Sequence, residues 1–282
     1  MQNILIEDRL FAIPSNYNEA TPGQIRAIVR YDSRKMKASD RFLMILLCLM
    51  DGPGRLWLRF RWFFKLTKAE AMLEMLDFTP EIEHFLSNTI PFYQQKFPVL
   101  RRFKQLYGPG DALSTITFRQ YRQTEEIGYR YRETKDEKDL DELLSVLYLR
   151  KPYTELWYKS VPERLMILDE QMVYRKKIIS RIPMDQKQAI FLWYLGSRSV
   201  LMHQFTRIFS SGKKSSEESD SAKITPAQIG SSYARLLDGL AEKATNYAEW
   251  DATNIYDVLN NYQEKLQESD RVKEASRNRK PA

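Results

Sequence analysis

Apolar and aromatic residues recur every three or four positions through residues 117–148. The members are Phe118, Tyr121, Thr124, Ile127 and Tyr131, then Leu140, Leu143, Leu144, Leu147 and Tyr148. Such spacing is typical of helices that bury one face. Thr117 and Gln120 form a capping box that starts the first helix, and Asp136 caps the second. The short break at residues 135–136 predicts that the two helices fold back as a hairpin.

The same pattern predicts further helices in the rest of the chain. Thr21 and Thr225 each open a Thr-Pro-x-Gln start signal, with proline at the first helical position and glutamine at the third. We predict helices over residues 22–31, 40–50, 67–76, 165–179, 185–208, 226–240 and 254–266. The helix from Asp185 is apolar over most of its surface and should be central. Residues 4–13 alternate weakly, which predicts a strand or a hairpin that turns at Glu7 and Asp8.

The predicted fold is mainly α, a multi-helix bundle with helical hairpins and a minor N-terminal β element. Residues 1–209 form the main helical domain, which includes the small β element. Residues 210–224 are polar and rich in serine, which predicts a flexible linker. Residues 225–282 form a C-terminal helical hairpin that ends in a frayed basic tail. The linker would let this hairpin dock separately.

Residues 56–66, LWLRFRWFFKL, are large and apolar or basic at nearly every position. As a strand, this segment would bury one face in the core of its own domain, namely Leu56, Leu58, Phe60, Trp62 and Phe64. The other face would carry aromatic and basic side chains together. We predict that this second face contacts a protein partner, with Trp57 as an anchor. The candidate interface residues are therefore Trp57, Arg59, Arg61 and Phe63. The alternative is that a helix of the same chain covers them.

The composition changes this picture little. Hydrophobic residues make up 43% of the chain, enough for a sizeable core, and 44 basic against 37 acidic residues give a net charge of +7. The single cysteine, Cys48, lies in an apolar run, so we expect a buried thiol and no disulfide within the chain, as in a reducing cytoplasm. The N-terminus lacks the features of a signal peptide. The longest apolar run, residues 42–50, is too short to span a bilayer, so we expect no membrane partner.

Candidate catalytic chemistry is sparse. His84 and His203 lie far apart without metal-ligand spacing, and His203 should have a structural role among apolar neighbours. Two groups of neighbouring carboxylates point apart on their helices, so they should not form a catalytic pair: Glu125 and Glu126, and Asp139, Asp141 and Glu142. We expect them to pair with nearby cations on a solvated face, namely Arg122, Arg130, Arg132 and Lys138. Neither a phosphate-binding loop nor a nucleophile elbow occurs. We therefore expect a protein that is not an enzyme, with no catalytic residue, cofactor or metal. A hydrolase or transferase built from dispersed acids and arginines is the weaker alternative.

Basic residues gather in three stretches of the sequence. The members are Arg55, Arg59, Arg61 and Lys65; Lys96, Arg101, Arg102 and Lys104; and Arg175, Lys176, Lys177 and Arg181. The first two stretches interleave with aromatic residues, as on surfaces that bind nucleic acid. Binding to nucleic acid, within a particle or during DNA packaging, is therefore the alternative function. Steep weakening by salt would distinguish phosphate binding from an apolar protein interface.

Three segments resemble a known family in order and spacing. Residues 13–24 read IPSNYNEATPGQ, residues 117–148 carry the helical block described above, and residues 254–259 read NIYDVL. They resemble proteins encoded in the structural gene clusters of tailed phages and prophages of Bacteroides-type bacteria, which are usually described as tail-assembly or virion-associated proteins. The first helix of the block departs from that family because Arg119 and Arg122 make it more basic.

The resemblance implies a non-enzymatic structural or assembly protein that acts through protein–protein contacts. Its partners would be other phage structural proteins. Its location would be the cytoplasm of the bacterial host during assembly, or the virion. The resemblance supplies no site residues.

Overall fold

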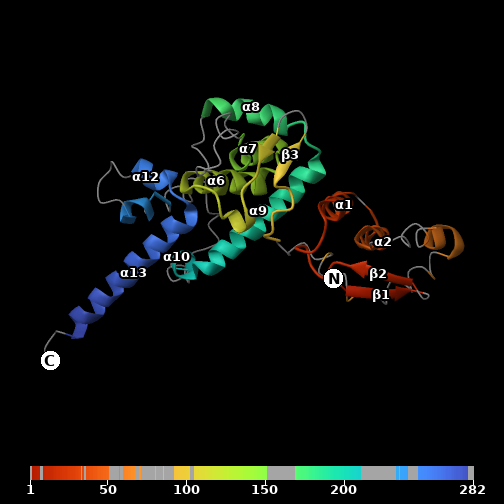
Figure 1. Cartoon of the computed structure of the whole chain (residues 1–282), viewed down its shortest axis with the longest axis horizontal. Coiled ribbons are helices and arrows are strands. Elements are labelled where there is room, and N and C mark those ends of the chain that lie inside the picture. Colours follow the sequence, from red (N-terminus) through yellow and green to blue (C-terminus); the bar gives the residue numbers. More distant parts are fainter. Residues whose placement is uncertain are drawn as a thin grey trace, which may run out of the picture. The chain divides into compact units, whose positions relative to one another are not determined.

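The structure is a computed structural model that describes residues 2–6, 9–32, 34, 36–50, 57, 60–67, 70, 80, 85, 92–101, 105–150, 169–210, 233–234, 236–240 and 247–278. Over these residues the chain is mainly α-helical with two small antiparallel sheets, which confirms the predicted fold class (Figure 1). The chain divides into two compact units, residues 1–97 with 183–197 and residues 98–182 with 198–282. The predicted boundaries at residues 209 and 225 are not the boundaries of these units, and residues 211–224 of the predicted linker lie outside the described part.

The first unit begins with a β-hairpin followed by helices. Its described elements are β1 (Gln2–Ile6), β2 (Arg9–Ile13), α1 (Pro22–Asp32), α2 (Ala38–Leu49), the short helical turn η1 (Arg61–Lys65) and the first part of α9 (Met184–Gln204). The two strands pair antiparallel with Ile4 opposite Phe11, so the predicted N-terminal hairpin is present. Of the helix predicted over residues 67–76, only Thr67 and Glu70 are described.

Local capping starts α1 where the sequence predicts it. The carboxamide Oε1 of Gln24 accepts a hydrogen bond from the Thr21 N–H at 2.8 Å, and the Thr21 hydroxyl accepts from the Gln24 N–H at 3.3 Å. The Nε2 atom of Gln24 also donates to the Leu49 carbonyl at 2.8 Å, which ties the start of α1 to the end of α2. The side-chain amide of Gln24 therefore both caps the start of α1 and binds the end of α2.

Buried side chains from β2, α1, α2 and α9 make the core of the first unit: Phe11, Ile13, Ile25, Ile28, Ile45, Leu46, Leu49, Ala189, Ile190 and Trp193. The indole Nε1 of Trp193 donates to the Tyr93 carbonyl at 2.9 Å, so its one polar group is satisfied inside the unit. Cys48 is a buried free thiol, as expected.

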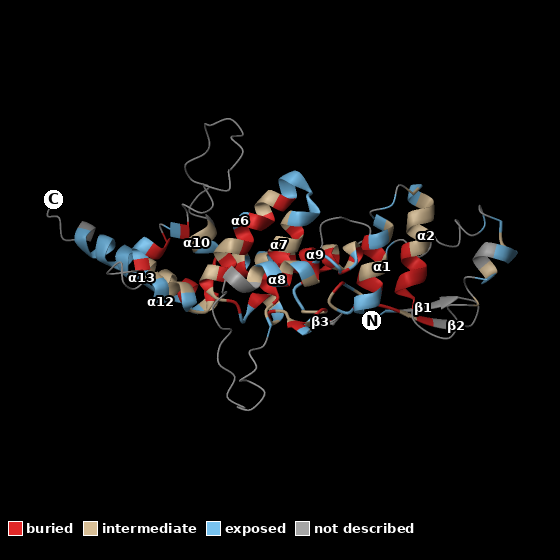
Figure 2. Cartoon of the chain, turned by 90° about the horizontal axis from the view of Figure 1, so that it is seen from above, coloured by how far each residue is buried: buried red, intermediate tan, exposed pale blue. Residues whose placement is uncertain are grey.

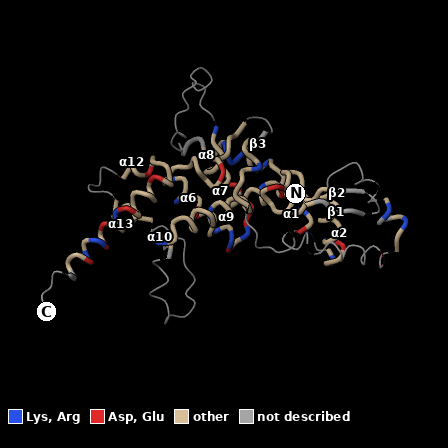
Figure 3. The backbone as a smooth tube through the Cα atoms, turned by 60° about the horizontal axis from the view of Figure 1, so that its bottom comes forward, with Lys and Arg blue, Asp and Glu red and all other residues tan. Residues whose placement is uncertain are grey.

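The second unit contains the predicted helical hairpin. Its described elements are β3 (Val99–Arg101), β4 (Gln105–Tyr107), η2 (Asp111–Leu113), α6 (Phe118–Thr134), α7 (Glu137–Leu147), α8 (Asp169–Ile179), the end of α9, α10 (Thr206–Ser210), α12 (Tyr247–Ala252) and α13 (Ile255–Asn278). Helix α13 continues through residues 269–278, which were predicted to be frayed. Acidic and basic residues are interspersed along it (Figure 3), and pairs such as Arg271–Glu268 support an exposed helix.

The hairpin of α6 and α7 forms as predicted. Thr117 and Gln120 make both bonds of the capping box, at 3.1 and 3.3 Å. Lys135 ends α6 in the left-handed region at φ 55°, and the Asp136 carboxylate accepts from the Lys138 N–H at 2.9 Å to start α7. All residues of both predicted stripes are buried, and Figure 2 shows the buried stretches along α6 and α7 in red. Burial of these two faces against each other and the rest of the unit stabilises the hairpin.

The start of α13 holds the turn that precedes α6. Ala112 and Leu113 have φ values of 50° and 63°, a region that side chains other than glycine seldom adopt. The Tyr256 hydroxyl donates to the Ala112 carbonyl at 2.7 Å, and the Asn254 Nδ2 atom donates to the Ser114 carbonyl at 2.7 Å. The NIYDVL segment therefore packs into the second unit and stabilises a strained turn there.

Candidate functional site

The predicted interface segment is helical at Trp57 and from Phe60 to Lys65, so the strand interpretation of residues 56–66 is wrong. Trp57 and Phe60 are helical, and residues 61–65 form the helical turn η1. The physical reason is that large apolar and basic residues occupy nearly every position of this segment. They therefore fit both the two-residue period of a strand and the 3.6-residue period of a helix. Strand and helix patterns then fit the sequence equally well, and alternation no longer identifies the buried face.

The change from strand to helix also changes which aromatic side chains face water. Phe60 and Phe64 were predicted to be buried, yet their side chains are 53% and 78% exposed. They lie four residues apart, so a helix places them on one face, and their ring centroids are 5.3 Å apart. Sequence reasoning missed this pair, although the spacing of four residues could have indicated it.

The structure describes three of the four predicted interface residues. The guanidinium of Arg61 lies over the Trp57 ring at 5.6 Å from its centroid, which is within the range of a cation–π contact. The structure therefore brings these two residues together, next to the exposed pair. Phe63 lies within η1, while Arg59 lies outside the described residues. We call the five residues Trp57, Phe60, Arg61, Phe64 and Lys65 the aromatic–basic patch.

The sequence around the patch is basic. Between Asp51 and Glu70 the chain contains arginines and lysines but no aspartate or glutamate. Lys65 is exposed, and the Glu70 carboxylate is turned onto Thr67, accepting from its N–H and its hydroxyl, each at 2.8 Å. These hydrogen bonds lower the pKa of Glu70, so it is a charged helix cap. The patch thus combines exposed apolar rings with cations.

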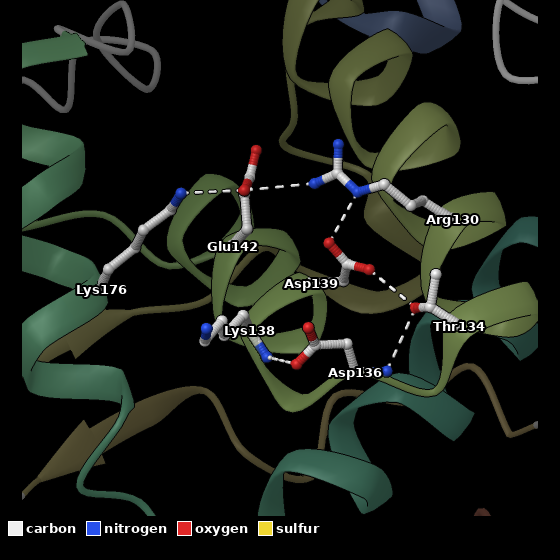
Figure 4. Close-up of polar contacts among 7 residues, drawn as sticks. All are labelled: Arg130, Thr134, Asp136, Lys138, Asp139, Glu142 and Lys176. Carbon is white, nitrogen blue, oxygen red and sulfur yellow. Dashed lines mark hydrogen bonds and ion pairs between the residues drawn. The ribbon is translucent and has the colours of Figure 1, made fainter.

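Most carboxylates singled out in the sequence join helices to one another. Figure 4 shows Arg130 of α6 between two acids of α7: its Nε donates to Asp139 at 2.6 Å, and its Nη2 lies 3.2 Å from Glu142. Glu142 also binds Lys176 of α8 at 2.9 Å. The predicted partner Arg130 is therefore correct for Asp139 and Glu142. The network connects three consecutive helices of the second unit across their partly exposed ends, which is a structural role.

A more deeply buried ion pair lies in the core of the second unit. The expectation that Glu125 lies on a solvated face is wrong, because its side chain is only 3% exposed. The Arg198 Nε, from α9, donates to its two carboxylate oxygens at 2.6 and 2.7 Å. The Tyr233 hydroxyl lies 3.3 Å from Glu125 Oε2 and 3.4 Å from the Tyr121 hydroxyl. Burial, and then the Glu125 charge, raise the pKa of Tyr121 far above its ordinary value, so this phenol stays protonated. The cluster is a compensated buried ion pair.

In the first unit, two arginines of α1 hold an acid at the start of α9. The Asp185 carboxylate accepts from Arg30 Nη2 at 2.6 Å and from Arg26 Nε at 3.3 Å. Burial raises the pKa of Asp185, but the hydrogen bonds and charges of both arginines outweigh this and hold the pKa below its usual range. An acid in the first turn of a helix is also favoured by the helix dipole.

The third predicted basic stretch does not form one cationic surface. Arg175 is buried, and its Nε donates to the Ser145 carbonyl at 2.8 Å. Lys176 pairs with Glu142, which leaves Lys177 and Arg181 as the exposed members. In the second stretch, Arg102 and Lys104 lie outside the described residues.

The structure describes one of the two histidines. His203 is exposed on α9, so the expectation that it packs among its apolar neighbours is wrong, and His84 lies outside the described residues. Within the described ranges, no group of three His, Cys, Asp or Glu side chains could hold a metal ion. In the same part of the chain, no helix combines the length and apolarity needed to cross a bilayer.

Comparison with known proteins finds no matching family model, no matching curated protein and no matching solved structure.

Proposed function

We propose that this chain is a non-enzymatic structural or assembly protein of a tailed phage or prophage, and that it acts through protein–protein contacts. Its partners are other structural proteins of the particle. Its place is the cytoplasm of the bacterial host during assembly, with the virion as a further place. The sequence motifs at residues 13–24, 117–148 and 254–259 support the family part of the proposal.

The observation that carries the binding part is the exposed pair Phe60 and Phe64. Two phenylalanine rings in contact with each other, both more than half exposed, lose a large apolar area from water when a partner covers them. Interface hot spots combine such rings with tryptophan and arginine, and here Trp57 and Arg61 lie beside the pair. The aromatic–basic patch therefore has the composition of a binding surface.

The carboxylates with described partners support a protein that is not an enzyme. Glu125, Asp139 and Asp185 each bind arginine from another helix and thereby hold helices together. A general acid or base needs a group that is open to substrate and has a pKa tuned near neutral pH. The pKa of Asp185 is instead held below its usual range, so this carboxylate stays charged at neutral pH.

The test is recovery of structural proteins encoded beside this gene by the immobilised full-length chain. We expect wild type to retain one of them, and Phe60→Ala/Phe64→Ala to weaken retention at least about tenfold, as loss of a hot spot does. The matched control is Val173→Ala/Val272→Ala, which trims two other exposed apolar side chains, on α8 and α13. Circular dichroism and thermal melting should show that all three proteins remain folded.

Equal recovery by wild type and the Phe60→Ala/Phe64→Ala variant would show that this patch is not the binding surface. If recovery disappears after nuclease treatment and falls steeply with salt, the chain binds nucleic acid, which is the alternative predicted from its basic stretches.

A further inference from the structure

The chain passes from one unit to the other at three points, and each point is marked in the sequence. Two of them are the bonds Phe97–Pro98 and Ile182–Pro183, which lie in irregular connections outside helices and strands. The residue before a proline is disfavoured in helical conformation, so a helix seldom continues across such a bond. The third point lies inside α9, between Ser197 and Arg198, where the helix continues without interruption. Helix α9 is therefore the crossing that a regular element makes.

The two residues at this crossing, Gly196 and Ser197, are unfavourable in the interior of a helix. Glycine loses more conformational freedom than alanine when a helix forms, and the serine hydroxyl competes with the helix for backbone groups. Kinks in helices occur at such glycine–serine pairs. Both residues are buried, so a need for a polar surface does not explain the serine.

The Ser197 hydroxyl makes no hydrogen bond in the continuous helix. The side chain is completely buried, and its Oγ has no hydrogen-bond partner among the described residues. A serine inside a helix can donate to the carbonyl four residues earlier, which belongs to Trp193 here, and that bond is not made. An unpaired buried hydroxyl costs free energy, so a conformation that pairs it is favoured by comparison.

A break in α9 at this point would use both residues as caps. Glycine is the residue most often found just after the end of a helix, where it adopts the left-handed conformation. Serine is among the preferred residues at the start of a helix, where its hydroxyl accepts from the N–H two or three positions on, here that of Ser199 or Val200. Gly196 would therefore end the first half, and Ser197 would start the second half with its hydroxyl paired.

Each half of α9 is held in its own unit by ion pairs. In the first half, the Asp185 carboxylate binds Arg26 and Arg30 of α1. In the second half, Arg198 binds Glu125 of α6, and this arginine directly follows the glycine–serine pair. The ion pairs resist separation of either half from its unit, so bending of α9 is concentrated at the residues between them.

We propose that α9 is a hinge that opens at Gly196 and Ser197 into two capped helices, and that the two units turn about this point. The continuous helix and the broken helix are two states of one element, and the Ser197 hydroxyl stabilises the broken state. Hinges are a few residues, often small, that absorb the change in backbone angles while the elements on either side move as rigid bodies. This inference does not depend on the proposed function, because it uses none of the residues of the aromatic–basic patch.

Hydrogen exchange of backbone amides in the full-length chain, resolved by residue with NMR, tests the hinge. A break after Gly196 separates the N–H groups of Arg198, Ser199 and Val200 from the carbonyls four residues earlier, and the Ser197 hydroxyl accepts from only one of them. We expect at least two of these three amides to have protection factors roughly tenfold lower than the amides on either side along α9. Uniform protection along α9 overturns the proposal.

Two serines of α9 provide a matched pair of variants. Ser197→Ala removes the unpaired hydroxyl and the cap of the broken state, so it should raise the protection of this turn at least roughly fivefold, as loss of an N-cap does. Ser199→Ala is the same change at an exposed position of the same helix, and it should give only the gain of about twofold from the helix propensity of alanine. Equal effects of the two variants would mean that propensity alone matters, which overturns the cap at Ser197.

Small-angle X-ray scattering tests whether the units turn. Gly196→Ala/Ser197→Ala disfavours both caps, so its distribution of interatomic distances should be narrower than that of wild type. Ser197→Ala alone serves the same comparison if the double variant does not fold, because it keeps the Cβ atom and only removes a hydroxyl. An unchanged distribution in a variant whose amide protection has risen overturns the turning of the units about α9.

Discussion

The α6–α7 hairpin and the η1 turn are both rich in aromatic and basic residues, yet one was predictable and the other was not. In the hairpin, polar residues separate the apolar positions, so only the helical period fits, and caps at Thr117 and Asp136 mark both starts. Residues 56–66 have no polar uncharged positions to break the pattern and no cap until Thr67. The polar positions between apolar residues therefore help to identify a helix as much as the apolar positions do.

The two regions also differ in what their aromatic residues do. Phe118 and Tyr121 are completely buried and stabilise the second unit, whereas Phe60 and Phe64 face water. Substitution in the hairpin should therefore change the free energy of unfolding, and substitution in the patch should change binding only.

The largest effect is expected from Glu125→Ala on α6. It leaves the partly buried Arg198 without its carboxylate, and breaking a buried pair from one side costs about 3–5 kcal/mol. Urea denaturation followed by circular dichroism measures the loss. The neighbouring Glu126→Ala is the control, because Glu126 is exposed and its removal should change stability by less than about 0.5 kcal/mol. Similar midpoints for the two variants would contradict the structural role of the pair.

Leu147→Ala in α7 should follow, at about 2–5 kcal/mol, because it removes a fully buried side chain and leaves a cavity. The same denaturation experiment applies. Leu266→Ala on α13 serves as the comparison, since that leucine is only half-buried and its loss should cost less. An unchanged midpoint for Leu147→Ala would show that α7 does not pack as described.

A smaller and pH-dependent effect is expected at Asp185. Its pKa is depressed in the folded chain, so its contribution to stability is present above the unfolded pKa of about 3.9 and is lost as the pH falls through the folded value. Both arginines stay partly in water, which limits the size of the effect. Asp185→Asn should lower stability at pH 7, and its effect should shrink as the pH falls through the depressed pKa of Asp185. Asp257→Asn, at an exposed site on α13, should show no such difference.

The smallest effect on stability, less than about 0.5 kcal/mol, is expected from Phe64→Ser, because this ring makes few contacts that folding creates. Phe118→Ser is the matched change at a fully buried ring of α6, and it should destabilise the chain by several kcal/mol, about 3–5 for removal of a buried phenylalanine. A strong loss of stability with Phe64→Ser would mean that this ring belongs to a core, and the aromatic–basic patch would then lose its basis as a binding surface.

The candidate site was partly within reach of the sequence. The segment, its basic character, and Trp57 and Arg61 as two of the four candidate residues were predicted from the sequence, whereas the contact between Trp57 and Arg61 was not. The exposed residues Phe60 and Phe64 did not follow, because assigning the wrong period exchanges the buried and exposed faces. In the same way, the basic stretch at residues 175–181 looked like one surface, but packing of α8 buries Arg175 and directs Lys176 to Glu142.

The sequence by itself determined the mainly helical fold, the hairpin at residues 117–148 and the capping of α1, α6 and α7. These features depend on residues within four positions of one another, where backbone geometry decides which groups meet. Only the tertiary structure decided that Glu125 meets Arg198, that two arginines of α1 hold Asp185, and that the start of α13 supports a strained turn before α6. Those partners lie far apart in the sequence, and nothing local distinguishes one arginine or tyrosine from another until packing brings them together.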